Sequence, residues 1–114
     1  MAVYTLSELY TAVLEDLGVV AAGQAASAAD TAAVTQATAQ VLDELEDENL
    51  VDWDPTANSI PSDRFLPLVD IIAQQVAPKF GKPRDMAVQT MATNRLRRRA
   101  AKNSDTEPVS VTYY

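Results

Sequence analysis

The chain has 114 residues and a formal net charge of −7 at pH 7, and only 6 % of its residues are aromatic. This length fits one domain, and the scarcity of aromatic side chains predicts a thin core of the kind that neighbouring subunits often complete. The absence of cysteine and histidine excludes disulfides, thiol nucleophiles, zinc fingers and histidine-based acid–base catalysis.

The first two predicted helices begin at recognisable caps. A capping box of Thr5 and Glu8 opens a helix over about 6–17. Ser27 opens a second, longer helix over about 28–48. Each has an apolar face at helical spacing. These faces comprise Leu6, Leu9, Tyr10, Val13, Leu14 and Leu17, and then Ala33, Val34, Ala37, Val41, Leu42 and Leu45.

The second helix ends in a run of acidic residues at the negative end of its dipole, where the charges also repel one another. We expect a partner outside the helix, or solvent, to meet them. Catalysis by paired carboxylates is disfavoured, because consecutive helical positions splay around the axis, and we expect no enzymatic activity. The run comprises Asp43, Glu44, Glu46, Asp47 and Glu48.

A loop or hairpin is predicted between the second and third helices, because residues 54–59 are rich in turn formers. We interpret Trp53 as a core or hinge anchor. Ser62 or Asp63 is predicted to cap the third helix, which ends by Gly81. The apolar face of that helix comprises Phe65, Leu68, Val69, Ile72, Val76 and Phe80.

Pro83 is predicted to open a fourth helix that runs to about Lys102. Its weak apolar stripe comprises Val88, Met91, Ala92, Leu96 and Ala100. The predicted fold is all-α: a small four-helix bundle-like domain over residues 1–102, with a short loop or hairpin between helices 2 and 3. An extended C-terminal tail over 103–114 completes the chain, and its end is β-prone.

Charge is segregated along the sequence. Residues 1–63 carry −12 and residues 64–114 carry +5, which together give −7. Two readings remain open: opposite surfaces that bind neighbouring molecules, or surfaces that pair within the monomer. The candidate residues of a subunit interface are Arg95, Arg97, Arg98, Arg99, Asp43, Glu44, Asp47, Asp52 and Asp54.

The basic segment Arg95–Lys102 also allows an alternative function, that of a small regulatory nucleic-acid-binding protein. No aromatic side chain interleaves the arginines and no helix–turn–helix spacing precedes them, so we disfavour this alternative. The N-terminus lacks the features of a signal peptide, and no apolar run approaches the roughly 20 residues of a membrane span. We expect a soluble intracellular protein with no cofactor, no metal and no membrane partner.

Several short motifs resemble a known family in their order and spacing. They are Tyr4-Thr5-Leu6-Ser7-Glu8-Leu9, Leu17-Gly18-Val19-Val20-Ala21-Ala22-Gly23-Gln24, Ser27-Ala28-Ala29-Asp30, the segment Leu50–Pro61, Phe65-Leu66-Pro67-Leu68-Val69 and Ala77-Pro78-Lys79-Phe80-Gly81. Together they resemble the head–tail adaptor proteins, also called connector or head-completion proteins, of tailed phages and gene transfer agents. The resemblance covers roughly residues 3–100.

The resemblance implies a structural virion protein in the neck between head and tail, present in the host cytoplasm during assembly. Such proteins form rings, typically of twelve subunits, beneath the portal protein. The ring extends the DNA channel, through which double-stranded DNA passes without specific binding, and a tail, stopper or nozzle protein docks below. The C-terminal segment would reach onto the portal, which makes Val109, Val111, Tyr113 and Tyr114 the expected portal-binding residues.

Overall fold

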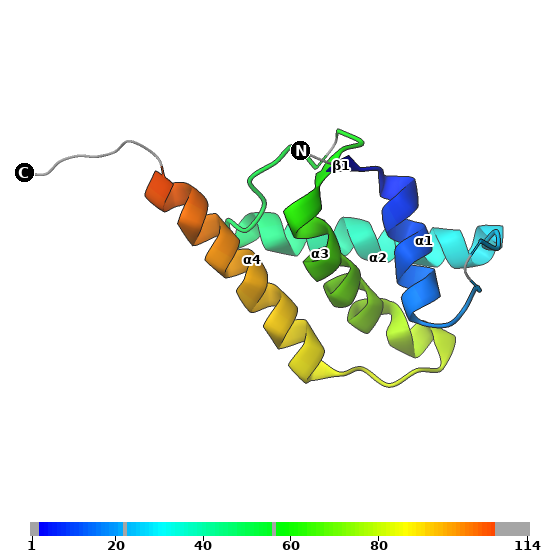
Figure 1. Ribbon diagram of the computed structural model, residues 1–114. Coiled ribbons are helices and arrows are strands. Elements are labelled where there is room, and N and C mark those ends of the chain that lie inside the picture. Colours follow the sequence, from blue (N-terminus) through cyan, green and yellow to red (C-terminus); the bar gives the residue numbers. More distant parts are fainter. Residues whose placement is uncertain (1–2, 22, 56, 107–114) are drawn as a thin grey trace, which may run out of the picture.

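Helix α3 (Ser62–Val76) lies at the centre of the fold, and the other helices pack around it (Figure 1). They are α1 (Leu6–Asp16), α2 (Ala28–Asp47) and α4 (Met86–Thr106), and a 3₁₀ helix, η1 (Ala77–Phe80), continues α3. The computed structural model describes residues 3–21, 23–55 and 57–106, the last five of these by backbone alone. The predicted all-α, four-helix class is confirmed.

Local hydrogen bonds fix both ends of the first helix. At its start, the Thr5 hydroxyl accepts from the Glu8 backbone N–H, and the Glu8 carboxylate accepts from the Thr5 N–H at 2.9 Å. At its end, Gly18 has a φ of 73°, and the Val19 N–H donates to the Leu14 carbonyl at 3.0 Å. The left-handed conformation of Gly18 lets the chain turn so that carbonyls at the end of the helix are hydrogen-bonded. The hydrogen bonds between Thr5 and Glu8 at the start of the helix confirm the predicted capping box.

The core consists of the apolar faces predicted for the first three helices, with a smaller contribution from α4. Fully buried side chains include Leu9, Val34, Leu68 and Ile72, and α3 is buried around most of its circumference. The predicted anchor Trp53 is half-buried against this core. A central helix surrounded on several sides explains why its sequence is apolar beyond one stripe.

The start of α4 differs from the prediction. Pro83 lies in the connection, and Asp85 caps the helix by accepting from the Ala87 and Val88 N–H groups at 3.0 and 3.3 Å. The aspartate carboxylate satisfies free N–H groups of the first turn, which a proline cannot do. Met91, predicted to face the core, is 66 % exposed, because the buried stripe falls on Ala92 and Leu96.

Helix α4 also ends later than predicted. It continues to Thr106, so the predicted tail at 103–114 begins inside the helix. No glycine or proline occurs between Lys102 and Glu107, and Pro108 is the first residue that cannot continue a helix. The tail residues Val109, Val111, Tyr113 and Tyr114 lie outside the residues that the structure describes.

The segment before α3 contains a feature that the sequence did not predict. Strand β1 (Val3–Tyr4) pairs antiparallel with β2 (Ile60–Pro61), so the end of the α2–α3 connection pairs with the N-terminus rather than with its own loop. Neither Ser62 nor Asp63 is the N-cap of α3; that position is Pro61, and no side chain caps this end. The strand pairing already fixes the backbone there, and the helix begins one residue earlier than a Ser62 cap would place it.

Two neighbouring leucines of α3 provide a test of this packing. Leu68 is fully buried and Leu66 is 60 % exposed. We expect Leu68→Ala to lower the free energy of unfolding by about 2–5 kcal/mol, because it removes apolar contacts and leaves a cavity. Leu66→Ala, the matched control, should change it by less than about 0.5 kcal/mol. Urea unfolding followed by circular dichroism measures both, and equal losses would contradict the arrangement.

Candidate functional site

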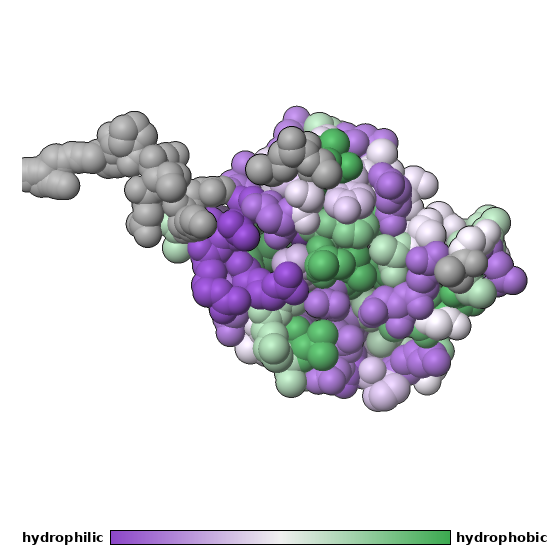
Figure 2. All heavy atoms as spheres, in the orientation of Figure 1, coloured by the Kyte–Doolittle hydropathy of each residue, from purple (hydrophilic) through white to green (hydrophobic). Residues whose placement is uncertain are grey.

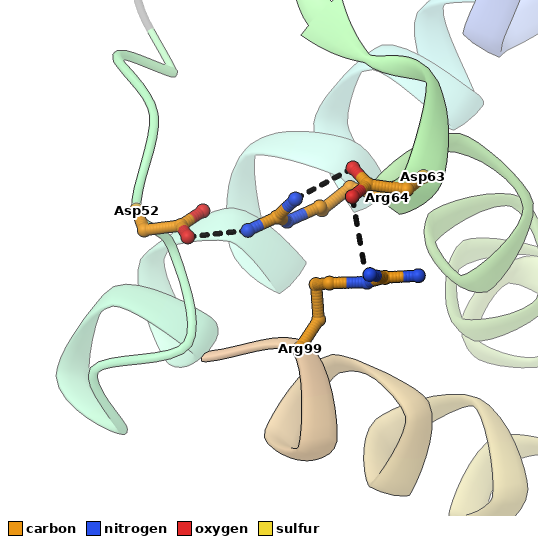
Figure 3. A network of polar contacts seen from close by, with 4 residues as sticks. All are labelled: Asp52, Asp63, Arg64 and Arg99. Carbon is orange, nitrogen blue, oxygen red and sulfur yellow. Dashed lines mark hydrogen bonds and ion pairs between the residues drawn. The ribbon is translucent and has the colours of Figure 1, made fainter. Parts of the chain in front are cut away.

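A buried arginine organises the polar contacts of the molecule. Arg64, on the first turn of α3, is only 7 % exposed, and its guanidinium pairs with the carboxylates of Asp52 and Asp63 (Figure 3). Asp52 lies in the α2–α3 connection, and Asp63 is the neighbouring residue of α3. A buried guanidinium is stable only when its donors are satisfied, so these carboxylates hold the connection against α3.

Asp63 extends this contact to α4. Its Oδ1 accepts from Arg64 Nη1 at 2.6 Å, and its Oδ2 lies 3.4 Å from Arg99 Nε (Figure 3). The hydrogen bond from Arg64 lowers the pKa of Asp63 below its ordinary value of 3.8, against the opposing effect of burial, and the charges of Arg64 and Arg99 lower it further. Asp63 therefore remains ionised at neutral pH and joins two helices. We call Asp52, Asp63, Arg64 and Arg99 the Arg64 network.

Another ion pair joins the end of α2 to the middle of α4. Arg97 donates to Glu48 at 2.9 Å, and both side chains are about half exposed. Together with the Arg64 network, this pair means that Asp52, Arg97 and Arg99 use their charges inside the monomer. The interpretation that the charged surfaces pair internally therefore applies to these three candidates; a role for them between subunits stays a prediction.

The other charged candidates lie on the surface. Asp43, Glu44 and Asp47 are exposed on the last turns of α2, and no ion pair joins them to a described side chain. Arg95 and Arg98 are exposed on α4 and likewise form no ion pair with a described side chain. The acidic candidates from α2 and the basic candidates from α4 thus leave two separate charged areas available to other molecules. Asp54 is also exposed, in the connection, and it has interactions of its own.

A cleft lies between α4 and the start of α3, and it is lined by Arg95, Arg98 and Arg99 of α4 and by Asp63 of α3. The cleft has a volume of about 260 Å³. The three arginines occupy positions i, i+3 and i+4 of one helix, which places them on the same side of α4. Figure 2 shows a strongly hydrophilic area over the C-terminal half of this helix. We call this feature the arginine cleft.

Asp70 of α3 interacts electrostatically with one arginine of the cleft, Arg95. Burial raises the pKa of its carboxyl above the ordinary 3.8, and the negative charge of Asp16 raises it further, whereas Arg95 lowers it. Arg95 is therefore partly compensated by a carboxylate within the chain.

The sequence does not single out Arg64 and Asp63 as residues that organise ion pairs of the fold. Arg64 falls within an apolar helix face, and Asp63 was interpreted only as a cap. The sequence offers one signal: Arg64 is the first basic residue after twelve acidic ones, and it lies next to the apolar face predicted for the third helix. A single cation at that position requires carboxylate partners, and Asp52 was one of the nearby candidates.

Within the described residues, no group of three or more aspartate or glutamate side chains is arranged to hold a metal ion. None of the helices in that part of the chain is both long and apolar enough to cross a membrane. Comparisons of the chain with protein-family models, with curated proteins and with solved structures gave no match.

The Arg64 network can be tested against the exposed ion pair. We expect Arg64→Ala to lower the free energy of unfolding at pH 7 by about 1.5–3 kcal/mol, because it leaves two carboxylates without their hydrogen-bonded cation. Arg97→Ala, which removes an exposed pair, should cost less than about 1 kcal/mol. Chemical denaturation of both variants gives the comparison, and an equal cost would show that burial of Arg64 contributes nothing.

The same variants carry a pH signature. Because the pKa of Asp63 is lower in the folded than in the unfolded chain, its contribution is present above the unfolded value near 3.8 and is lost as pH falls through the folded value. The stability difference between wild type and Arg64→Ala should therefore narrow in acid below about pH 4. A difference that stayed constant there would contradict the assigned role of Asp63.

Proposed function

We propose that this chain is a structural subunit of a virion neck, a head–tail adaptor that works by binding other protein chains and catalyses no reaction. In this proposal several copies form a ring between the portal protein and a tail or stopper protein, and DNA passes through the ring without specific binding. The resemblance of residues 3–100 to head–tail adaptors supports this assignment, and so does the all-α fold of the chain.

The observation that carries the proposal is the exposed acidic surface at the end of α2. Asp43, Glu44 and Asp47 project into solvent at the negative end of the helix, where each charge costs about 0.3–1 kcal/mol. Glu48 alone of the acidic run is ion-paired to a described residue, Arg97. A cationic surface on another chain would relieve this repulsion, which favours a role in binding a protein partner.

Exposed apolar side chains support the same role. Leu66, Met86 and Met91 are each at least 60 % exposed. In Figure 2, hydrophobic residues reach the surface over the middle of α3 and over the start of α4. Methionine adapts its shape to a partner and is enriched in the cores of protein interfaces. Charged and apolar areas on one subunit can supply contacts between unlike faces, and such contacts form a ring when the rotation between subunits closes.

The C-terminal segment is the proposed contact with the portal. Its residues 107–114 follow α4, and the alternation of Val109, Val111 and Tyr113 suits a strand that adds to the edge of a partner's sheet. The segment follows the end of α4 at Thr106, which lies away from the helical core (Figure 1).

Charge reversal at the end of α2 tests the proposal. We expect Asp43→Lys with Glu44→Lys to abolish ring assembly on the portal protein of the same virion, as observed by electron microscopy and native mass spectrometry. A positive charge near the C-terminal end of a helix interacts favourably with the helix dipole, so the variant should fold at least as well as wild type. Glu15→Lys with Asp16→Lys makes the same charge change at the end of α1 and should leave assembly intact. Assembly by the α2 variant would defeat the proposal.

A further inference from the structure

The arginine cleft differs from the other charged areas because it is cationic in a chain of net charge −7. Of its four lining residues, three are arginines and one is a carboxylate, Asp63. Both oxygens of Asp63 are already engaged, one by Arg64 and the other by Arg99. Asp52 supplies the second negative charge for Arg64, so the four members of the Arg64 network balance to zero.

Two arginines that line the cleft, Arg95 and Arg98, lie outside this balance. Arg95 is partly compensated by Asp70, whereas Arg98 has no ion pair with a described side chain. Guanidinium groups at i, i+3 and i+4 repel one another, which costs a few tenths of a kcal/mol per pair on a helix surface. An anion between them would remove that repulsion and replace weak hydration with charge-assisted hydrogen bonds.

We propose that the arginine cleft binds a phosphate oxyanion, contacted by the guanidinium groups of Arg95 and Arg98. Arg99 forms the wall of the site and is held in place by Asp63 at 3.4 Å. Guanidinium groups present planar pairs of N–H donors that match two oxygens of one phosphate group. The ligand is either free inorganic phosphate or a phosphodiester of nucleic acid, since both present the same oxygens.

The cleft is separate from the exposed acidic surface at the end of α2, because its lining comes from the start of α3 and from α4. The site does not depend on the proposed ring contact, because Asp43 and Glu44 do not line it.

The test is a titration of the isotope-labelled full-length chain, followed by NMR at constant ionic strength. Inorganic phosphate should shift the arginine side-chain Nε–Hε resonances of Arg95 and Arg98, and sodium acetate at the same concentration should not. Arg98→Gln should weaken phosphate binding by about tenfold, the equivalent of losing one charge-assisted hydrogen bond. Lys82→Gln, with the same loss of charge in the α3–α4 connection, should weaken it by less than about twofold.

Arg98→Lys separates geometry from charge, because lysine keeps the charge but not the planar pair of donors. We expect intermediate affinity for this variant. A 12-base-pair duplex identifies the source of the ligand: competition between duplex and phosphate at Arg98 points to a phosphodiester, and phosphate binding without duplex binding points to the free ion. The proposal is overturned if phosphate shifts neither arginine, if acetate binds equally well, or if Lys82→Gln and Arg98→Gln behave alike.

Discussion

The burial of one guanidinium determines how the polar parts of this molecule are arranged. Arg64 lies among the residues of the most buried helix, and removing its charge from water is favourable only while Asp52 and Asp63 remain in contact with it. That requirement draws the α2–α3 connection onto the start of α3. Through Asp63 and Arg99 it also fixes the basic part of α4, whose apolar contribution to the core is small. The position of the arginine cleft follows from these contacts.

The charged side chains of the described residues fall into two groups. Glu48, Asp52 and Asp63 are joined to basic residues of the chain, so they contribute to its own stability. The carboxylates on the last turns of α2 and the guanidinium of Arg98 have no ion pair with a described side chain and remain on the surface. The proposed functions rest on this second group: a protein partner for the carboxylates, and an oxyanion for Arg98.

Helix positions could be predicted where the signal is local. The Thr5–Glu8 capping box and the Ser27 cap involve residues three apart, and apolar spacing located the core faces of the first three helices. The features that could not be predicted depend on contacts between residues far apart in the sequence. The pairing of Val3–Tyr4 with Ile60–Pro61 joins segments more than fifty residues apart, and the burial of Arg64 depends on Asp52. At the start of α4, a local alternative was missed: the Asp85 carboxylate accepts two N–H hydrogen bonds that Pro83 could not accept. The segregation of acidic and basic residues along the sequence identified the charged candidates. Only the fold shows which of them form ion pairs within the chain.

Electron cryomicroscopy of an intact particle that contains this chain tests the central claim most directly. The account predicts a ring of density beneath the portal into which α1 to α4 fit, with the exposed end of α2 against another protein chain and residues 107–114 in contact with the portal. A neck built entirely from other proteins, or a ring in which the end of α2 faces only solvent, would contradict it.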